Sequence, residues 1–345
     1  MGTSKHHRYL TRAKEAKADE FYTTYEAIDR ELRHYRTDLK DRHVICDCND
    51  RPDRSMFVSW TLDHMNEYGI ASLTCTSFQP DHGTLFDDGT PAMQWHVDND
   101  GRDGYSIADL AARPLDGDGS FDSSECERLL DRPGAIVVTT PPFSKAIRFM
   151  RMLRRHPDTD YLIIANLNLL TANDVLPMVK EGRCLVGLSI HSGSMFFRLP
   201  DDRPKTGSMI RPDGTVGVNS TRWLTSLAAA RADKTWPPTG HTYRGHEDEY
   251  PEYDAYDAIN VDSMRMMPDD HDGPMGVPVN FLEHWAPGNG FMLLDNLDAP
   301  TIDGRHLYKR LLVRRTRAHD PRRPRIQAEP PMPDASRYRH SRIPN

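Results

Sequence analysis

The tetrapeptide Thr140-Pro141-Pro142-Phe143 follows a continuous apolar run at residues 135–139. Two consecutive prolines after a buried strand fix the backbone, so that the next carbonyl faces the cleft without a competing amide donor. The Phe143 ring offers a face for stacking a flat ring, and the Thr140 hydroxyl and a backbone carbonyl can accept hydrogen bonds from an amino group. Such contacts orient an exocyclic amino nitrogen toward a methyl donor. The same residues also suit a rigid turn with a core aromatic side chain, and both interpretations stay open at this point.

A second polar turn, Asp47-Cys48-Asn49-Asp50, follows the apolar residues 44–46. Its carboxylates suit a ligand that carries an amino group or ribose hydroxyls. No Gly-x-Gly follows this strand, so the glycine-rich loop expected of a nucleotide site is missing. The turn can equally be a helix-capping cluster. Residues 19–24, which include Tyr22 and Thr23, can likewise be a loop and a helix cap.

Other reactive side chains form no site in the sequence. Five of the sixteen histidines are scattered over loops, and no pair among these five has the helical spacing of a metal site, so no metal is predicted. These histidines are His82, His96, His241, His246 and His271. The five cysteines are an odd count without zinc spacing and are predicted to be reduced thiols. They are Cys46, Cys48, Cys75, Cys126 and Cys184. No nucleophile-elbow motif supports a Ser–His–Asp triad.

The elements that must position the two polar turns alternate between strands and helices for about 150 residues. We predict strands at 43–47, 71–76, 135–139, 161–165 and 184–190, and helices at 24–35, 55–68 and 144–155. The economical fold is an α/β, Rossmann-like, doubly wound parallel sheet. Ligands bind such sheets beyond the carboxyl ends of the strands, so the turns at 47–50 and 140–143 are expected to meet there.

Charge and hydropathy limit the class of protein. The net charge of −7 weighs against a nucleic-acid partner, yet basic residues cluster at 145–155 and at 305–325. Those clusters permit a basic face, although they can also be solvated surfaces. No apolar run is long enough to cross a bilayer, and the start of the chain does not read as a secretory signal, so a cytoplasmic location is predicted.

Together, a series of segments resembles the EcoRI-type adenine-specific DNA methyltransferase family. The similarity runs from about residue 13 to residue 315, and several segments in one order are far more specific than any single motif. The matching segments are 16–26, 44–50, 135–144, 162–168, 219–225, 253–261, 275–282 and 308–315. The glycine-poor turn at 44–50 resembles the family's own version of the cofactor loop, which accounts for the missing Gly-x-Gly.

This resemblance implies an S-adenosylmethionine-dependent enzyme that methylates the N6 amino group of adenine in a specific sequence of double-stranded DNA. The implied catalytic residues are Thr140, Pro141, Pro142 and Phe143. The implied cofactor-binding residues are Tyr22, Thr23, Asp47, Asn49 and Asp50. The candidate DNA-binding residues are Lys145, Arg148, Arg222, Trp223, Lys309 and Arg310, with a core anchor as the alternative for Trp223. A cognate restriction endonuclease is a candidate partner, and a monomer suffices because each event flips one base.

The domain organisation is predicted in the same way. Residues 1–12 are expected to be a flexible N-terminus and 13–200 a methyltransferase catalytic core. Residues 201–272 are the candidate target-recognition region, and the strands of 273–316 are expected to complete the core. Residues 317–345 are predicted to be a basic, proline-rich tail.

One position departs from the family, which has asparagine where this chain has Thr140. The threonine hydroxyl is on a shorter stem than the asparagine amide oxygen, and it can both donate and accept. The departure predicts weak activity, an altered target or no activity. Two alternatives therefore accompany the main hypothesis: a protein that binds DNA or cofactor without transferring methyl, and an enzyme of the same fold that acts on RNA or a protein amide.

Overall fold

The computed structural model describes residues 21–79, 89–199, 209–232, 234 and 236–316. The chain divides into two compact units. The first unit comprises Met1–Leu169 and Gly187–Ala229, and the second comprises Leu170–Val186 and Ala230–Asn345. The predicted N-terminus (1–12) and basic tail (317–345) lie outside the described residues.

The first unit is built on a mixed sheet whose strands follow the order β5-β4-β3-β2-β6-β7-β11. Four central strands are parallel: β2 (His43–Cys46), β3 (Ser72–Thr76), β6 (Ala135–Thr139) and β7 (Asp160–Asn166). Three flanking strands pair antiparallel: β4 (Met93–Asp98), β5 (Ala111–Pro114) and β11 (Thr221–Thr225). The predicted parallel sheet is therefore right for the centre and wrong for the flanks, where hairpin and return connections bring strands back in the opposite direction.

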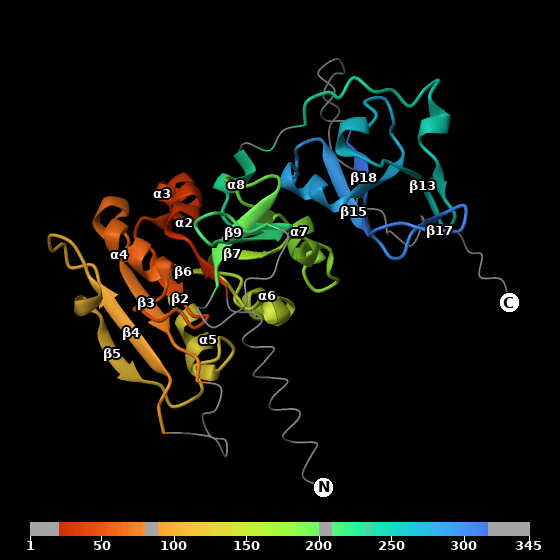
Figure 1. Cartoon of the computed structure of the whole chain (residues 1–345). Coiled ribbons are helices and arrows are strands. Elements are labelled where there is room, and N and C mark those ends of the chain that lie inside the picture. Colours follow the sequence, from red (N-terminus) through yellow and green to blue (C-terminus); the bar gives the residue numbers. More distant parts are fainter. Residues whose placement is uncertain (1–20, 80–88, 200–208, 233, 235, 317–345) are drawn as a thin grey trace, which may run out of the picture. The chain divides into compact units, whose positions relative to one another are not determined.

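The helices of the first unit lie on both faces of this sheet. They are α2 (Tyr25–Leu32), α3 (Arg36–Leu39), α4 (Met56–Tyr68), α5 (Ser124–Leu130) and α6 (Ala146–Arg155). Figure 1 shows α2, α3 and α4 on one side of the sheet and α5 and α6 on the other. The connection from β2 through α4 leads to β3, whereas β6 leads through α6 to β7 on the opposite side, so the strand order reverses between β2 and β6.

Local sequence signals begin and end several of these helices. Thr24 caps α2 by accepting a hydrogen bond from the Ala27 N–H, and Ser123 caps α5 through Cys126. Gly69 ends α4 in the left-handed conformation at φ 64°. The helix predicted at 144–155 begins at Ala146, because a 3₁₀ turn at Phe143–Lys145 precedes α6, and Ser144 of that turn lines a cavity.

A separate small sheet carries the segment that precedes α2. Strand β1 (Tyr22–Thr23) pairs antiparallel with β9 (Ser194–Arg198), which also pairs with β10 (Val216–Asn219). The register sets Thr23 opposite Phe197, and Thr23 is 5% exposed. The pairing with β9 therefore holds Thr23 in place from a part of the chain that lies far away in sequence.

The second unit has its own five-stranded sheet, in the order β12-β13-β14-β18-β15. These strands are β12 (Glu252–Tyr253), β13 (Tyr256–Asn260), β14 (Pro274–Pro278), β15 (Phe291–Leu297) and β18 (Arg310–Arg315). The unit also holds α7 (Leu176–Lys180), β8 (Leu185–Val186) and the ladder of β16 (Thr301–Ile302) with β17 (Arg305–His306). Helix α8 (Ala229–Ala232) begins at the last residue of the first unit.

This second sheet includes strands from both sides of the domain boundary that was predicted between residues 272 and 273. The strands of 273–316 pair with one another and with β13, which belongs to the predicted recognition region, and they do not complete the parallel sheet. Their apolar side chains share a core of their own, which includes Tyr253, Leu297 and Leu312. Hydrophobic alternation identifies a strand without identifying its partner, so the sequence could not distinguish these arrangements.

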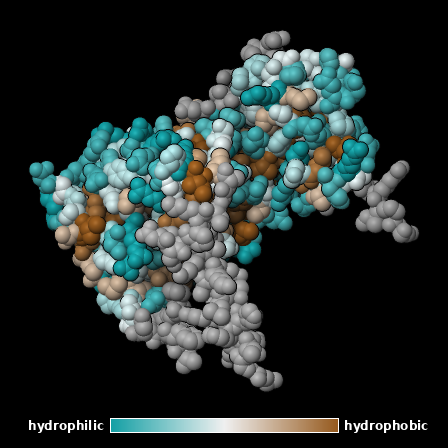
Figure 2. Space-filling view, viewed as in Figure 1, coloured by the Kyte–Doolittle hydropathy of each residue, from teal (hydrophilic) through white to brown (hydrophobic). Residues whose placement is uncertain are grey.

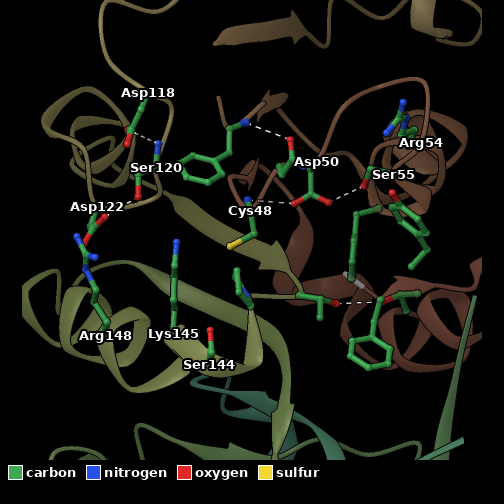
Figure 3. Close-up of a pocket in the computed structure, with 18 of the residues that line it drawn as sticks. Cys48, Asp50, Arg54, Ser55, Asp118, Ser120, Asp122, Ser144, Lys145 and Arg148 are labelled. Carbon is green, nitrogen blue, oxygen red and sulfur yellow. Dashed lines mark hydrogen bonds and ion pairs between the residues drawn. The ribbon is translucent and has the colours of Figure 1, made fainter. Parts of the chain in front are cut away.

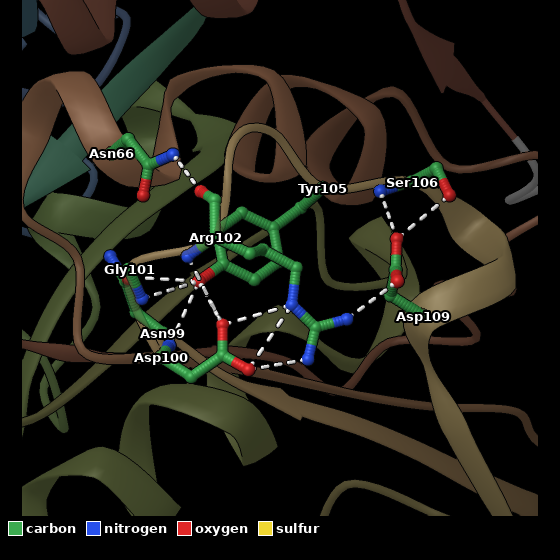
Figure 4. A network of polar contacts seen from close by, with 8 residues as sticks. All are labelled: Asn66, Asn99, Asp100, Gly101, Arg102, Tyr105, Ser106 and Asp109. Carbon is green, nitrogen blue, oxygen red and sulfur yellow. Dashed lines mark hydrogen bonds and ion pairs between the residues drawn. The ribbon is translucent and has the colours of Figure 1, made fainter.

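The loop between β4 and β5 is held by a polar network centred on Tyr105 (Figure 4). The Tyr105 hydroxyl accepts hydrogen bonds from the N–H groups of Asp100 and Gly101 at 2.8 and 3.1 Å, and it donates one to Asn99 Oδ1 at 2.8 Å. Arg102 forms ion pairs with Asp100 and with Asp109. These contacts thus order the connection between the antiparallel strands β4 and β5.

Replacing Tyr105 with phenylalanine is expected to lower the free energy of unfolding by about 1 kcal/mol, because the part-buried hydrogen bonds of its hydroxyl with the Asp100 N–H and with Asn99 Oδ1 are lost. The Gly101 N–H keeps Asn99 Oδ1 as a second acceptor at 3.0 Å. Denaturant titration followed by circular dichroism measures this change. Tyr308→Phe is the matched control, since Tyr308 is 88% exposed. Equal stability of the two variants would contradict the structural role of the Tyr105 hydroxyl.

Hydrophilic residues cover much of the face seen in Figure 2, with smaller hydrophobic areas between them. Within the described residues, none of the helices has the length and apolar character that crossing a membrane requires.

Candidate functional site

A cavity of about 600 Å³ opens in the first unit where the strand order reverses, within the size range of ligand sites. The turns after β2 and β6 both contribute to its wall, as predicted for the carboxyl ends of a parallel sheet. The lining residues are Phe21, Tyr22, Thr23, Cys48, Asn49, Asp50, Arg54, Ser55, Met56, Phe57, Phe78, Asp118, Ser120, Asp122, Ser123, Thr140, Pro142, Ser144, Lys145 and Arg148. Figure 3 shows Asp50 and Ser55 across the cavity from Ser144, Lys145 and Arg148.

Hydrogen bonds of Asp50 connect the turn after β2 to the end of β6. Its carboxylate accepts hydrogen bonds from Ser55 Oγ at 2.7 Å, Thr139 Oγ1 at 2.5 Å and the Cys48 N–H at 3.3 Å. Burial raises the pKa of Asp50, although these three donors oppose the rise. The helix-turn interpretation of Asp50 is therefore supported by its contacts, while Asp50 also lines the cavity.

Asp47 differs from Asp50 in both position and partners. It is 1% exposed and does not line the cavity. Its Oδ1 accepts a weak bond from Cys48 Sγ at 3.7 Å, and its buried Oδ2 has no hydrogen-bond partner among the described residues. Burial, followed by repulsion from Asp50, raises the pKa of Asp47 to about 7. A buried carboxyl with a raised pKa and an oxygen without a hydrogen-bond partner among the described residues thus lies next in sequence to the cavity residue Cys48.

Asn49 links the turns that follow β2 and β3. Its backbone adopts the left-handed region at φ 62°, which asparagine tolerates better than most residues. The side-chain oxygen Oδ1 accepts a hydrogen bond from the Phe78 N–H at 3.1 Å. This contact brings Phe78 to the cavity wall, where no sequence motif had indicated it.

The hydroxyl groups of Thr140 and Thr23 lie 2.9 Å apart, across 117 positions of sequence. Thr140 and Pro142 line the cavity, whereas Pro141 is buried and is not among the lining residues. The Phe143 ring is 5.3 Å from that of Phe21 and 6.3 Å from that of Phe197, measured between ring centroids. The tetrapeptide is thus both a rigid turn beside an aromatic cluster and a source of one hydroxyl at the cavity.

A rim of mixed charge is formed by the start of α6 and by residues 118–123. Arg148 forms an ion pair with Asp122, which in turn accepts a hydrogen bond from Ser120 Oγ at 2.7 Å (Figure 3). The Lys145 ammonium lies 4.9 Å from the centroid of the Phe78 ring. The predicted basic residues Lys145 and Arg148 therefore belong to the cavity itself.

Four other predicted DNA-binding residues lie elsewhere. Arg222 and Trp223 are 4% and 1% exposed in β11, which corrects the expectation that they face DNA and supports the core alternative for Trp223. Strand β11 is buried at every position, so its side chains have no solvent-facing side. Arg310 is 9% exposed and close to Asp262, and Lys309 is exposed and bonds to the Thr171 carbonyl. Both belong to the second unit.

The sequence analysis gave no role to the acidic residues Asp118 and Asp122, because they belong to no recognisable motif. Gly119 brings them to the cavity: its φ is 69°, and a Cβ there would lie 2.0 Å from the Ser77 carbonyl oxygen. A glycine between two turn residues was the available signal for this close approach. Among the described residues, no group of three or more histidines, cysteines or acids has the geometry to hold a metal ion.

Comparison with known proteins identifies one matching family and several similar proteins. The family described as adenine-specific methyltransferase EcoRI matches residues 9–330. The Type II methyltransferase M.EcoRI of Escherichia coli is 31% identical over 328 residues, covering 92% of this chain and 99% of that protein. The Type II methyltransferase M.MpnI of Mycoplasma pneumoniae is 33% identical over 304 residues, covering 86% and 88%. The Type II methyltransferase M.MgeORF184P of Mycoplasma genitalium is 25% identical over 333 residues. No solved structure matches the chain significantly.

Proposed function

Since the chain belongs to the EcoRI family of adenine-specific methyltransferases, we propose that it transfers a methyl group from S-adenosylmethionine to N6 of adenine in a specific sequence of double-stranded DNA. The observation that carries this proposal is the cavity at the reversal of strand order, whose wall includes both Thr140 and the turn after β2. The fold is accordingly interpreted as a Rossmann-like methyltransferase sheet. Family membership supports an active enzyme and gives no support to a chain that only binds DNA or cofactor.

The residues around the cavity fit S-adenosylmethionine. When bound, this cofactor supplies an electrophilic methyl group on a sulfonium. Tyr22, Thr23 and Asn49 provide polar groups at the wall, and Asp50 holds the turn that carries Asn49. Asp47 does not line the cavity but adjoins the lining residue Cys48. It is the proposed partner of the cofactor's ammonium group, because its buried Oδ2 lacks a hydrogen-bond partner among the described residues and a cation would satisfy it.

Thr140 is the proposed acceptor for one hydrogen of the target amino group. Because the Thr23 hydroxyl lies 2.9 Å away, the two hydroxyls share one hydrogen bond, and a lone pair of Thr140 Oγ1 remains for the substrate. Pro141 and Pro142 restrict the backbone that presents this hydroxyl. The aromatic cluster around Phe143 keeps that side of the turn rigid, and Phe143 is the proposed stacking partner of the flipped base.

Partners follow from the same proposal. Lys145 and Arg148 at the cavity rim, and Lys309 of the second unit, are candidates for contacts to DNA. Sequence recognition is proposed for residues 201–272. A monomer suffices for flipping one base, and the Type II names of the relatives support a cognate restriction endonuclease. A DNA substrate supports the cytoplasmic location predicted from the sequence.

The test is to incubate the purified protein with unmethylated plasmid and isotopically labelled S-adenosylmethionine, and then to analyse nucleosides by mass spectrometry. Label is expected in N6-methyladenine. Pro142→Ala is expected to lower kcat by about 10- to 100-fold, because a looser turn misplaces the acceptor. Pro133→Ala, in the exposed turn before β6, is the control. Label in RNA or protein but not in DNA, or label in cytosine, would overturn the proposal.

A further inference from the structure

A second cavity of about 510 Å³ lies in the first unit where the chain passes from β1 into α2. Thr24 lines this cavity, whereas its neighbour Thr23 lines the first one. We infer that the second cavity binds one phosphate group of the DNA backbone, next to the nucleotide that enters the first cavity. This inference rests on the proposed function, since it assigns a part of the same substrate.

Three arginines of different elements meet at this cavity: Arg30 of α2, Arg198 at the end of β9, and Arg211. Within the described part of the chain, none of them forms an ion pair. Many other arginines do, as Arg42 does with Asp160 and Arg36 with Glu67. Arg198 and Arg211 are exposed and accessible to a ligand. Guanidinium groups provide the planar, multiple donors that phosphate oxygens prefer.

Two carboxylates also line the cavity, and together with the arginines they determine the net charge of its lining. Asp213 accepts hydrogen bonds from the N–H and the hydroxyl of Thr215 at 2.9 and 2.7 Å. These bonds, and more weakly the charges of Arg211 and Arg198, lower the pKa of Asp213. Glu26 is the other. With three arginines against two carboxylates, the lining carries one net positive charge, in a chain whose net charge is −7. A phosphodiester, which carries a single negative charge, matches this balance.

The side chain of Glu31, which is fully buried, binds the backbone of the cavity wall. Its carboxylate accepts hydrogen bonds from the N–H groups of Leu188 and Ser189, both at 2.8 Å. Gly187 makes this possible, since a Cβ there would lie 2.1 Å from Glu31 Oε1. Ser189 lines the cavity, and its buried hydroxyl has no hydrogen-bond partner among the described residues. A prepared wall with an unused donor is suited to a polar ligand.

The position of Arg211 is fixed in a similar way. Its guanidinium carbon lies 3.4 Å from the centroid of the Phe196 ring, so that the planar group stacks on the aromatic face. Stacking leaves the N–H donors at the edge of the guanidinium available to phosphate oxygens. Because β9 also pairs with β1, the strand that carries Arg198 is the one that positions Thr23 beside Thr140. Strand β9 therefore links the proposed phosphate site to the placement of the target base at Thr140.

The test uses the full chain and a duplex that contains the methylation site, identified by sequencing methylated DNA. Dissociation constants are measured by fluorescence anisotropy over a salt series for wild type, Arg198→Gln and Arg211→Gln. Each substitution is expected to weaken DNA binding roughly tenfold and to lower the slope of log K against log salt by about one. Binding of S-adenosylhomocysteine, measured by calorimetry, is expected to stay unchanged. Arg128→Gln, an exposed charge on α5 that does not line the cavity, is the matched control.

A second arm identifies the phosphate. One phosphate at a time, at the positions flanking the target adenine, is replaced with a neutral methylphosphonate. At one of these positions the replacement is expected to weaken DNA binding by wild type but not by Arg198→Gln or Arg211→Gln. Arginine variants that bind DNA as Arg128→Gln does would overturn the inference, as would additive losses at every methylphosphonate position. Failure of the proposed function is a different result, because wild type itself would then neither methylate nor bind the duplex.

Discussion

Replacing Thr140 with asparagine is expected to raise kcat for adenine methylation about tenfold, which corresponds to about 1.4 kcal/mol of transition-state stabilisation. The asparagine oxygen reaches farther into the cavity than the threonine hydroxyl, which is also shared with Thr23 at 2.9 Å. Since the contact to the amino group strengthens as the methyl is transferred, kcat is expected to change more than KM. Steady-state kinetics with labelled cofactor measures both constants.

Valine substitutions provide the matched controls, because they remove a hydroxyl at nearly constant shape. Thr140→Val is expected to lower kcat by a factor of about 3 to 10, as the loss of one hydrogen bond implies. Thr23→Val is expected to have a smaller effect, and the two substitutions together are expected to be non-additive because the hydroxyls are partners. Unchanged kcat in Thr140→Val would remove Thr140 from the reaction, and loss of activity in Thr140→Asn would show that this cavity is fitted to threonine.

Replacing Asp47 with asparagine is expected to stabilise the cofactor-free protein above pH 7 and to weaken cofactor binding at the same pH. Burial raises the pKa of Asp47 from an ordinary value of 3.8 to about 7. Between these values the folded state keeps a proton that the unfolded state has released, so stability declines as pH rises from about 4 to 7. The part of this decline that Asp47 contributes, on the order of a few kcal/mol, is absent in the variant. The part that comes from Asp50, whose pKa burial also raises, remains. Denaturant titrations at pH 5 and pH 8 measure it.

Whereas Asp47→Asn is expected to stabilise the cofactor-free protein, it is expected to weaken cofactor binding. If the ionised Asp47 pairs with the cofactor's ammonium group, wild type binds S-adenosylmethionine more tightly as pH rises through 7, and the variant binds it about 10- to 100-fold more weakly at pH 8. Asp53→Asn, an exposed carboxylate on the same turn, is the control for both measurements. Equal pH dependence of stability in variant and wild type would mean that Asp47 does not titrate as described, and unchanged affinity would separate it from the cofactor.

The predicted parts of the fold are those whose signal is local. The apolar run at 135–139 and the tetrapeptide after it correspond to β6 and to the turn that lines the cavity. The strands at 43–46 and 72–76 and the helix from Met56 also agree with the pattern of the sequence. In each case burial follows from consecutive apolar residues or from helical periodicity, which neighbours in sequence define.

Contacts between segments that are distant in sequence could not be predicted from such local signals. Hydrophobic alternation predicted strands at 273–316 but not their pairing with β13 in a second sheet. The tryptophan at 223 could equally have faced DNA until β11 was found to be buried on both sides.

The sequence by itself therefore determined the alternating strands, the rigid Thr140 turn and, through its motifs, membership of a methyltransferase family. Only the tertiary structure decided that Thr23 meets Thr140, that Asp118 and Asp122 line the cavity, and that Asp50 binds the turn after β2 to β6. The physical reason is that local propensity depends on nearby residues, whereas these contacts depend on which strands become neighbours. Strand order is set by the packing of the whole core, and many orders share the same local pattern.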